Sequence, residues 1–94
     1  GITIFQDPAQ FISKTYVGKL ISVQGTSLPT TLSVAIDGRD YVVQLSTTTE
    51  ILNTAKKHVL LSRFLTGDPI RIYGKKVESL SNIIEAEVVR NINI

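Results

Sequence analysis

The sequence predicts an all-β fold, a small five-stranded barrel with one short helix between the third and fourth strands. The chain has 94 residues, which is the size of a single domain. Its hydrophobic fraction is 43%, much of it Ile, Val and Leu, and β-branched side chains favour strands. Short runs that alternate apolar and polar residues recur along the chain, separated by turn residues. Together these features predict strands that share one core.

Composition narrows the function classes. The chain has no cysteine, which excludes disulfides, thiolate nucleophiles and Cys-ligated zinc. The formal net charge is only +2, and the densest basic clusters, Lys56-Lys57-His58 and Lys75-Lys76, are short for a nucleic-acid binder. No apolar run approaches the ~18–20 residues that span a membrane, so we expect no membrane span.

The first 14 residues stand apart from the strand pattern. Residues 2–5 are expected to be briefly extended. Asp7 would cap a short helical turn that runs to Ile12, with Pro8 at its first helical position. We therefore predict an N-terminal arm or linker over residues 1–14 and a barrel domain over residues 15–94.

Three strands joined by short turns come next. Gly18 lies inside the first strand, where glycine marks a bulge or a tight bend. Asp37-Gly38 predicts a type I′ hairpin, because both turn positions need a positive φ. Tyr41 follows in the return strand and alternates with Val43, so both are expected in one core with Leu32 and Val34 of the preceding strand and with Ile70 and Ile72. The predicted strands are residues 15–25, 30–36 and 39–45.

The second half supplies a helix and two more strands. After a polar break, residues 50–61 have roughly helical apolar spacing, so a short helix is expected to start near Thr54 and to plug an open end of the sheet. A turn at residues 66–69 places Pro69 at the start of a strand. The last strands are predicted at residues 70–77 and 83–90, with Ile84, Ala86 and Val88 inward and Ile83 and Val89 outward.

This order of elements matches the OB-fold, a five-stranded Greek-key barrel, with an SH3-like barrel as the alternative. The patterns Val17-Gly18-x-Leu20, Gly38-x-x-Tyr41-x-Val43 and Phe64-x-x-Gly67-Asp68-x-Ile70-x-Ile72-x-Gly74 resemble small bacterial OB-fold-like domains of unknown function. The resemblance covers residues 15–92. It implies the fold and a place in exported or envelope proteins, and it implies no chemistry.

The sequence contains no recognisable catalytic or metal-binding motif. His58 is the only histidine, and no motif places it beside a nucleophile with an orienting carboxylate. The carboxylates are scattered rather than set at metal-ligand spacing. A phosphate-binding glycine loop and a dinucleotide fingerprint are both lacking. We therefore predict that the protein is not an enzyme and uses no catalytic residue, metal or cofactor.

The candidate ligand-binding residues occupy outward strand positions. OB-folds bind oligonucleotides around strands 2 and 3, but the outward positions there are neither aromatic nor basic. Arg71, Tyr73 and Lys75 alternate along one strand, so two cations flank a ring on one face. A solvated strand face is the simpler interpretation. Lys19 and Arg39 are further candidates, provided that strands 1 and 4 pair in the closed barrel.

These observations predict a non-enzymatic OB-like binding or scaffolding module. Because the chain opens with Gly1 and lacks methionine, it is expected to belong to a larger protein, and the resemblance implies export. Outward Val42, Ile83 and Val89 would suit contact with residues 2–12, with a neighbouring domain or with a protein partner. The competing hypothesis is a weak single-stranded nucleic-acid-binding domain that uses the strand of Arg71. The ligand, the oligomeric state and the cellular location are left open.

Overall fold

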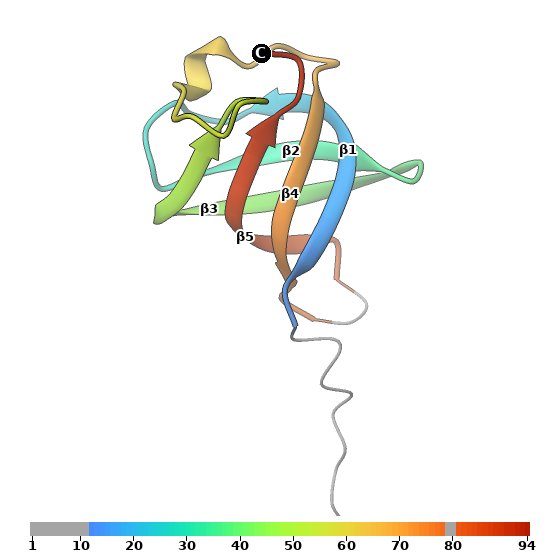
Figure 1. Ribbon diagram of the computed structural model, residues 1–94. Helices are drawn as coiled ribbons and strands as arrows, with labels where there is room; N and C mark the ends of the chain where they lie inside the picture. The colour runs from blue at the N-terminus through green and yellow to red at the C-terminus, as the bar shows by residue number, and fades with distance from the viewer. Residues whose placement is uncertain (1–11, 79–80) are drawn as a thin grey trace, which may run out of the picture.

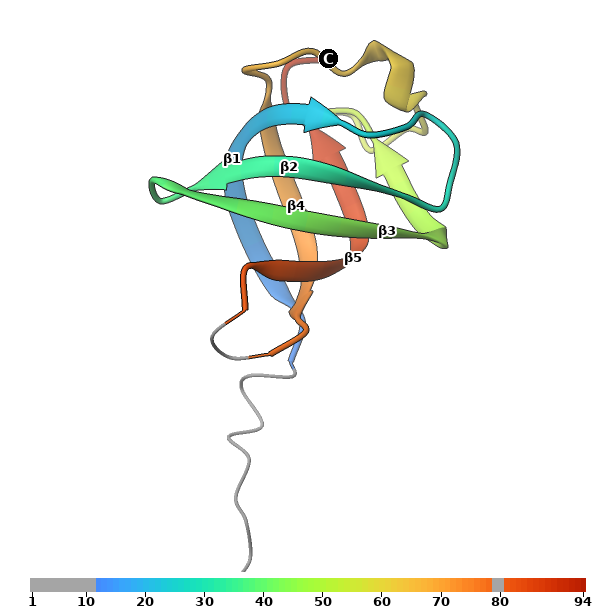
Figure 2. The ribbon, with the colours of Figure 1, turned by 180° about the vertical axis from the view of Figure 1, so that it is seen from behind.

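The chain closes into a five-stranded β-barrel (Figures 1 and 2). The computed structural model describes residues 12–78 and 81–94. The segments expected at residues 2–5 and after Asp7 lie outside this described part. The all-β class and the five-stranded closed barrel are confirmed. The elements are β1 (Lys14–Val23), β2 (Thr30–Ile36), β3 (Arg39–Leu52), the 3-10 helix η2 (Leu61–Arg63), β4 (Pro69–Lys76) and β5 (Ile83–Asn91).

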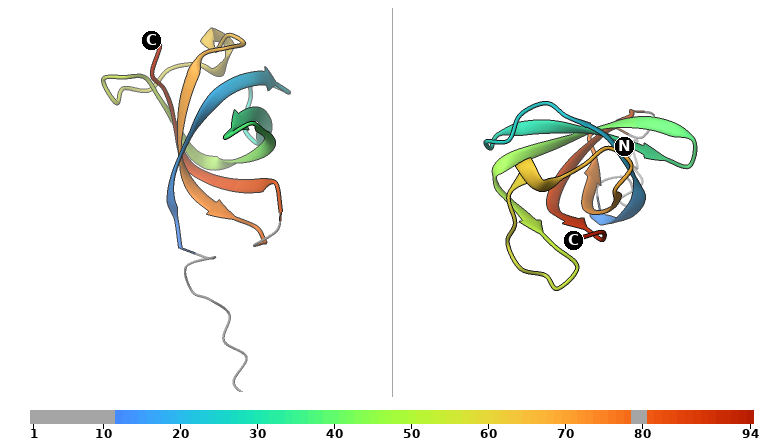
Figure 3. Two further views of the ribbon diagram at one scale, coloured as in Figure 1. Left: turned by 90° about the vertical axis from the view of Figure 1, so that its right-hand side faces the viewer. Right: turned by 90° about the horizontal axis from the view of Figure 1, so that it is seen from above.

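The order of strands around the barrel is β1-β2-β3-β5-β4, and β4 pairs with β1 to close it. All neighbours are antiparallel except β3 and β5, which run parallel. The pairing of strands 1 and 4, on which several candidate site residues depended, is therefore present. The view from above shows the strands surrounding a common interior (Figure 3).

The β2–β3 hairpin forms as the Asp-Gly signal predicts. Asp37 has φ 51° and Gly38 has φ 79°, the left-handed values that a type I′ turn requires. The turn fixes the register of the two strands, so that Val34 lies opposite Tyr41. Tyr41 is only 9% exposed, which confirms its predicted place in the core.

One apolar cluster fills the barrel. The predicted core residues of β2, β3 and β4 all meet in it, and most of them are completely shielded from solvent. Because alternate residues of each strand point inward, a closed sheet of five strands encloses a continuous interior. The central residues are Leu32, Val34, Tyr41, Val43, Ile70, Ile72 and Ile84.

The helical element between β3 and β4 is η2, which lies later than the helix predicted near Thr54. That part of the prediction is wrong, because β3 continues to Leu52. The chain then turns back at Lys56, which has φ 62°, and the amide of Val59 donates to the carbonyl of Ile51 at 3.0 Å. Parallel pairing with β5 holds residues 50–52 in a strand, so a tertiary contact overrides the helical spacing.

The predicted outward position of Val89 is also wrong. Val89 is fully buried, whereas Val88 is only half-buried. The register between β4 and β5 skips Glu87, between Ala86 and Val88, which is a β-bulge. One extra residue shifts the alternation by one position, so every later side chain of β5 changes face.

The polar break at residues 46–49 is a second bulge and does not end β3. Leu45 pairs with Ala86 and Glu50 pairs with Val88, so four residues of β3 lie opposite a single residue of β5. The hydroxyl of Thr49 is buried and donates to the carbonyl of Ala86 at 2.8 Å. This side-chain bond joins the two strands where the backbone ladder is interrupted, so β3 bends around the barrel as one strand.

Two glycines allow close approach of neighbouring strands. A Cβ atom on Gly18 would collide with the carbonyl oxygen of Ala35 on β2. A Cβ atom on Gly74 would collide with the carbonyl oxygen of Glu85 on β5. Both contacts involve backbone atoms, so the barrel closes tightly only where these side chains are absent.

Candidate functional site

Two rows of side chains cross four neighbouring strands on one side of the barrel. The strand registers define these rows without reference to side-chain conformation. Each row takes one residue from β1, β4, β5 and β3 in turn. The first row is Val17, Arg71, Arg90 and Leu52, and the second is Thr15, Tyr73, Val88 and Glu50.

All members of these rows except Val17 line a hollow of about 320 Å³, which we call the basic hollow. Lys56, from the turn that follows β3, completes its rim. Three cationic side chains therefore line the hollow, and Glu50 is the one carboxylate among the lining residues. The full lining is Thr15, Glu50, Leu52, Lys56, Arg71, Tyr73, Val88 and Arg90.

Arg71 and Arg90 lie directly opposite each other on β4 and β5. In such antiparallel pairs the Cβ atoms are about 4.5–5.5 Å apart, and like charges at this spacing destabilise the sheet. A bound anion between the two guanidinium groups would remove that repulsion. The arrangement therefore has a physical reason to attract negative charge.

Arg90 is held in place by the turn that follows β3. Its Nη2 atom donates to the carbonyl of Thr54 at 2.9 Å. Its Nε atom is buried and has no hydrogen-bond partner within the described residues. Buried polar groups usually have a partner, so this unpaired donor is unusual, and because the atom is shielded from solvent, a ligand acceptor reaches it only after the side chain shifts.

Tyr73 presents its ring beside the arginine pair. The residue is 45% exposed and lies opposite Val88 on β5. Arg71 precedes it by two residues, so ring and guanidinium share the outer face of β4 as the alternation predicted. An exposed ring next to cations can hold a planar group by stacking while the cations bind a neighbouring anion.

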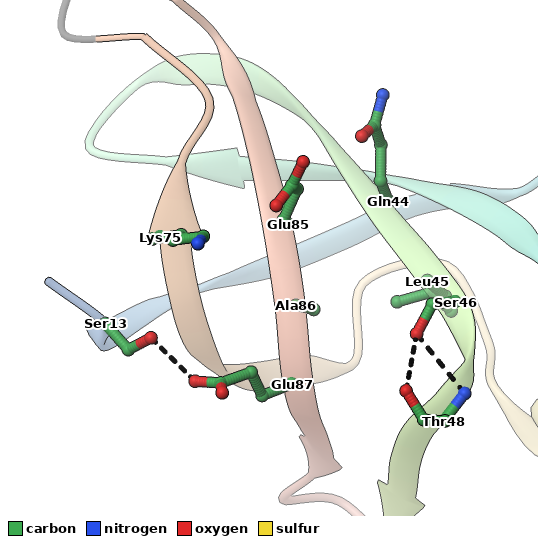
Figure 4. A pocket seen from close by; sticks show the side chains of 9 residues that line it. All are labelled: Ser13, Gln44, Leu45, Ser46, Thr48, Lys75, Glu85, Ala86 and Glu87. Carbon is green, nitrogen blue, oxygen red and sulfur yellow. Dashed lines mark hydrogen bonds between the residues drawn. The ribbon is translucent and has the colours of Figure 1, made fainter. Parts of the chain in front are cut away.

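Lys75, the third candidate on β4, lines a different hollow of about 670 Å³ (Figure 4). It lies directly opposite Glu85 on β5. Glu87 lines the same hollow and accepts a hydrogen bond from the hydroxyl of Ser13 at 2.6 Å. Two carboxylates offset one lysine here, so this hollow suits an anion less well than the basic hollow does.

Lys19 and Arg39 are not part of the basic hollow. Lys19 is exposed on β1, opposite Ala35 on one side and Pro69 on the other. Arg39 is exposed at the start of β3, beside the hairpin turn. The structure thus brings together Arg71 and Tyr73 of the five predicted site residues.

Arg90 and Lys56 are the contributors that sequence reasoning missed. In the sequence Lys56 stands only within a short basic cluster, and the turn that places it at the hollow lies where a helix was predicted. Arg90 follows the bulge of β5, so its face could not be assigned from simple alternation. An arginine at the end of the last strand was the only signal, and it was too weak to select that residue.

A third hollow, of about 390 Å³, lies between the first residues of β1 and the β2–β3 hairpin; we call it the edge hollow. Two lysine–tyrosine pairs line it: the Nζ atom of Lys14 lies 5.2 Å from the ring centre of Tyr16, and that of Lys76 lies 5.5 Å from Tyr41. Burial raises the pKa of Tyr16, and the neighbouring Tyr41 raises it further. Sequence reasoning did not connect these four residues.

The apolar side chains proposed for a protein contact do not form one outward patch. Val42 is 41% exposed and Ile83 is half-buried, but Val89 lies in the core. The prediction that Val89 takes part in an outward contact surface is therefore wrong.

Residues 12–78 and 81–94 contain no group of three or more His, Cys, Asp or Glu side chains that could hold a metal ion. In that same part of the chain, no helix has the length and apolar character needed to cross a membrane. No family model, curated protein or solved structure matches the chain. The resemblance to small bacterial OB-fold-like domains therefore stays a prediction.

Proposed function

We propose that this chain is a non-enzymatic, OB-like binding module whose basic hollow receives an anionic group of its ligand. Support for the OB-like assignment comes from the five-stranded barrel with the order β1-β2-β3-β5-β4, and from the short helical turn between β3 and β4. A binding role fits a rigid barrel that carries its polar groups on the outer face.

The observation that carries this proposal is the like-charged pair of Arg71 and Arg90. A protein gains no stability from two guanidinium groups on directly opposite residues of a sheet. Lys56 adds a third positive charge at the same hollow, against Glu50 alone. Such a concentration of charge on a chain of net charge +2 is best explained by an anionic ligand.

Single-stranded nucleic acid is the candidate ligand that Tyr73 favours. Single-strand binders combine cations that contact phosphates with aromatic rings on which bases stack. The basic hollow offers both within one cavity, since the row that holds Tyr73 lies next to the row that holds Arg71 and Arg90. The site lies across β1, β4, β5 and the last residues of β3, whereas OB-folds usually bind oligonucleotides around strands 2 and 3.

Titration of the full chain with a short fluorescent oligothymidine across a salt series tests both proposals. The logarithm of affinity should fall steeply with the logarithm of salt concentration, because phosphate contacts release counterions. Replacing Tyr73 with alanine should weaken binding by about 1–3 kcal/mol if bases stack on its ring. Loss of the arginine charge in Arg71→Gln should weaken binding and reduce the salt slope.

Arg39→Gln provides the matched control, because Arg39 is an exposed arginine outside the basic hollow. It should leave affinity unchanged. Equal losses for Arg39→Gln and Arg71→Gln would mean that the net charge, and not the hollow, attracts the oligonucleotide. If polyglutamate competes but Tyr73→Ala has no effect, the anion-binding proposal stands and the nucleic-acid proposal falls. Absence of binding by both polyanions at low salt would contradict both.

A further inference from the structure

Half of β1 has an unpaired edge. On one side, β1 pairs with β4 continuously from Lys14 to Lys19. On the other side, pairing with β2 begins only at Lys19, because β2 ends at Ile36 and the chain turns away. Among residues 12–78 and 81–94, no other strand pairs with this edge. Figure 3 shows the lower part of β1 running apart from β2 and β3.

The hydrogen-bond pattern identifies the backbone groups that face this opening. The amide of Leu20 donates to the carbonyl of Asp68 at 2.9 Å, so the backbone of Leu20 points toward the β4 side. Hydrogen-bonding direction alternates along an antiparallel strand, so Thr15, Val17 and Lys19 point the opposite way. Lys19 meets Ala35 of β2 there.

Thr15 and Val17 therefore present two amides and two carbonyls to the opening. Both side chains are exposed, and Val17 is 57% exposed. A row of unpaired backbone donors and acceptors on a sheet edge is a template for another strand. A peptide backbone in extended conformation matches that alternating pattern.

The edge hollow adjoins these groups and supplies charge. Its cations are Lys14 and Lys76, and Asp37 is the one carboxylate in its lining. The rings of Tyr16 and Tyr41 form its inner wall, next to the core. A strand that paired with β1 would direct every second side chain toward these lysines and tyrosines.

We propose that this edge binds an extended acidic segment of a partner protein, which adds to β1 as a short strand. Its backbone would pair with Thr15 and Val17, and its acidic side chains would lie beside Lys14 and Lys76. Recognition of this kind takes affinity from backbone hydrogen bonds and specificity from alternate side-chain pockets. Charge argues against a second copy of this chain as the occupant, because two lysine-bearing edges would meet. Thr15 lines both hollows, but this proposal does not depend on which ligand the basic hollow binds.

A pair of labelled synthetic peptides tests the proposal on the full chain. One peptide alternates glutamate with valine, and the other has lysine in place of glutamate. Fluorescence anisotropy should detect binding of the glutamate peptide and no binding of the lysine peptide. Amide hydrogen exchange, followed by NMR, should slow by at least about tenfold at Thr15 and Val17 when the glutamate peptide is present.

Adjacent lysines on β4 provide a matched pair of variants. Lys76→Glu changes the edge hollow and should weaken binding of the glutamate peptide by about tenfold or more, equivalent to about 1.4 kcal/mol. Lys75→Glu changes the neighbouring residue, which lines the other hollow, and should leave affinity unchanged. A glutamate peptide N-methylated on alternate residues should not bind, and this arm does not depend on the folding of any variant.

Three outcomes would overturn the proposal: equal binding of both peptides, unchanged binding after N-methylation, or exchange protection confined to other strands. Sedimentation of the chain alone as a dimer with protected Thr15 and Val17 amides would assign the edge to self-association instead.

Discussion

Replacing Gly74 with alanine should destabilise the barrel by about 2 kcal/mol. The added Cβ atom would collide with the carbonyl oxygen of Glu85 and come within 2.9 Å of the Cα atom of Ala86. Both are backbone atoms of β5, so relief requires the two strands to separate. Overpacking of this kind costs about 1–3 kcal/mol, and backbone contacts place Gly74 near the upper limit.

Part of this cost is offset in the unfolded chain. Alanine has fewer unfolded conformations than glycine, which returns about 0.4–1 kcal/mol of stability. For a domain of this size, 1 kcal/mol corresponds to about 4–8 °C, so the net effect should lower Tm by about 8–16 °C. Urea denaturation and thermal unfolding, both followed by circular dichroism, measure the free energy and Tm.

Gly25→Ala is the matched control. The closest neighbour of a Cβ atom at Gly25 is the Oγ1 atom of Thr30 at 3.1 Å, which is a side-chain atom that can rotate away. The stability of Gly25→Ala should therefore stay within about 0.5 kcal/mol of the unmodified chain. If Gly74→Ala is as stable as Gly25→Ala, the close approach of β4 and β5 is not what requires glycine.

Three further predictions test the charge, packing and bulge assignments. A hydrogen bond from Asn91, supported by the amide of Leu65 and by Asn93, lowers the pKa of Asp68 below 3.8 despite its burial. The ionised Asp68 carboxylate therefore stabilises the fold above pH 4, and this stabilisation is lost as pH falls below it. Tm measured across this range should fall less in Asp68→Asn than in the unmodified chain. Equal slopes of Tm against pH in the two proteins would contradict the assignment. Arg71→Gln should leave Tm unchanged or raise it at low salt, because it removes repulsion from Arg90; a large loss of Tm would show a structural role. Val89→Ala removes buried methyl groups and should lower the free energy of unfolding, measured by urea denaturation, by about 2 kcal/mol. An equal loss for Val88→Ala would contradict the position of the bulge.

The sequence was sufficient to predict the strands that pair with a neighbour close in the chain. The Asp-Gly turn places β2 and β3 opposite each other, and both Leu32 and Val43 were expected in the core where they lie. Pro69 begins β4 as predicted. In these regions turn chemistry and alternation agree, so local pattern determines the structure.

The rest depended on contacts between distant residues. Residues 50–52 follow helical spacing, yet they pair with residues 88–90 of β5. The bulge at Glu87 has no signature in a single sequence, and it decides which of Val88 and Val89 is buried. The bulge also decides on which face Arg90 lies. The sequence therefore predicted only part of the candidate site: Arg71 and Tyr73, which lie on the regular strand β4, but not Arg90, which follows the bulge of β5.

The last strand in the sequence, β5, lies between β3 and β4 in the barrel. A nascent chain that ends before residue 83 would therefore leave two strands without their shared neighbour, and it would lack Ile84 and Val89 from the interior. Such long-range pairing is slow compared with hairpin formation. The domain should acquire its structure only after synthesis of β5 is complete, and C-terminal truncation by even one strand should abolish folding.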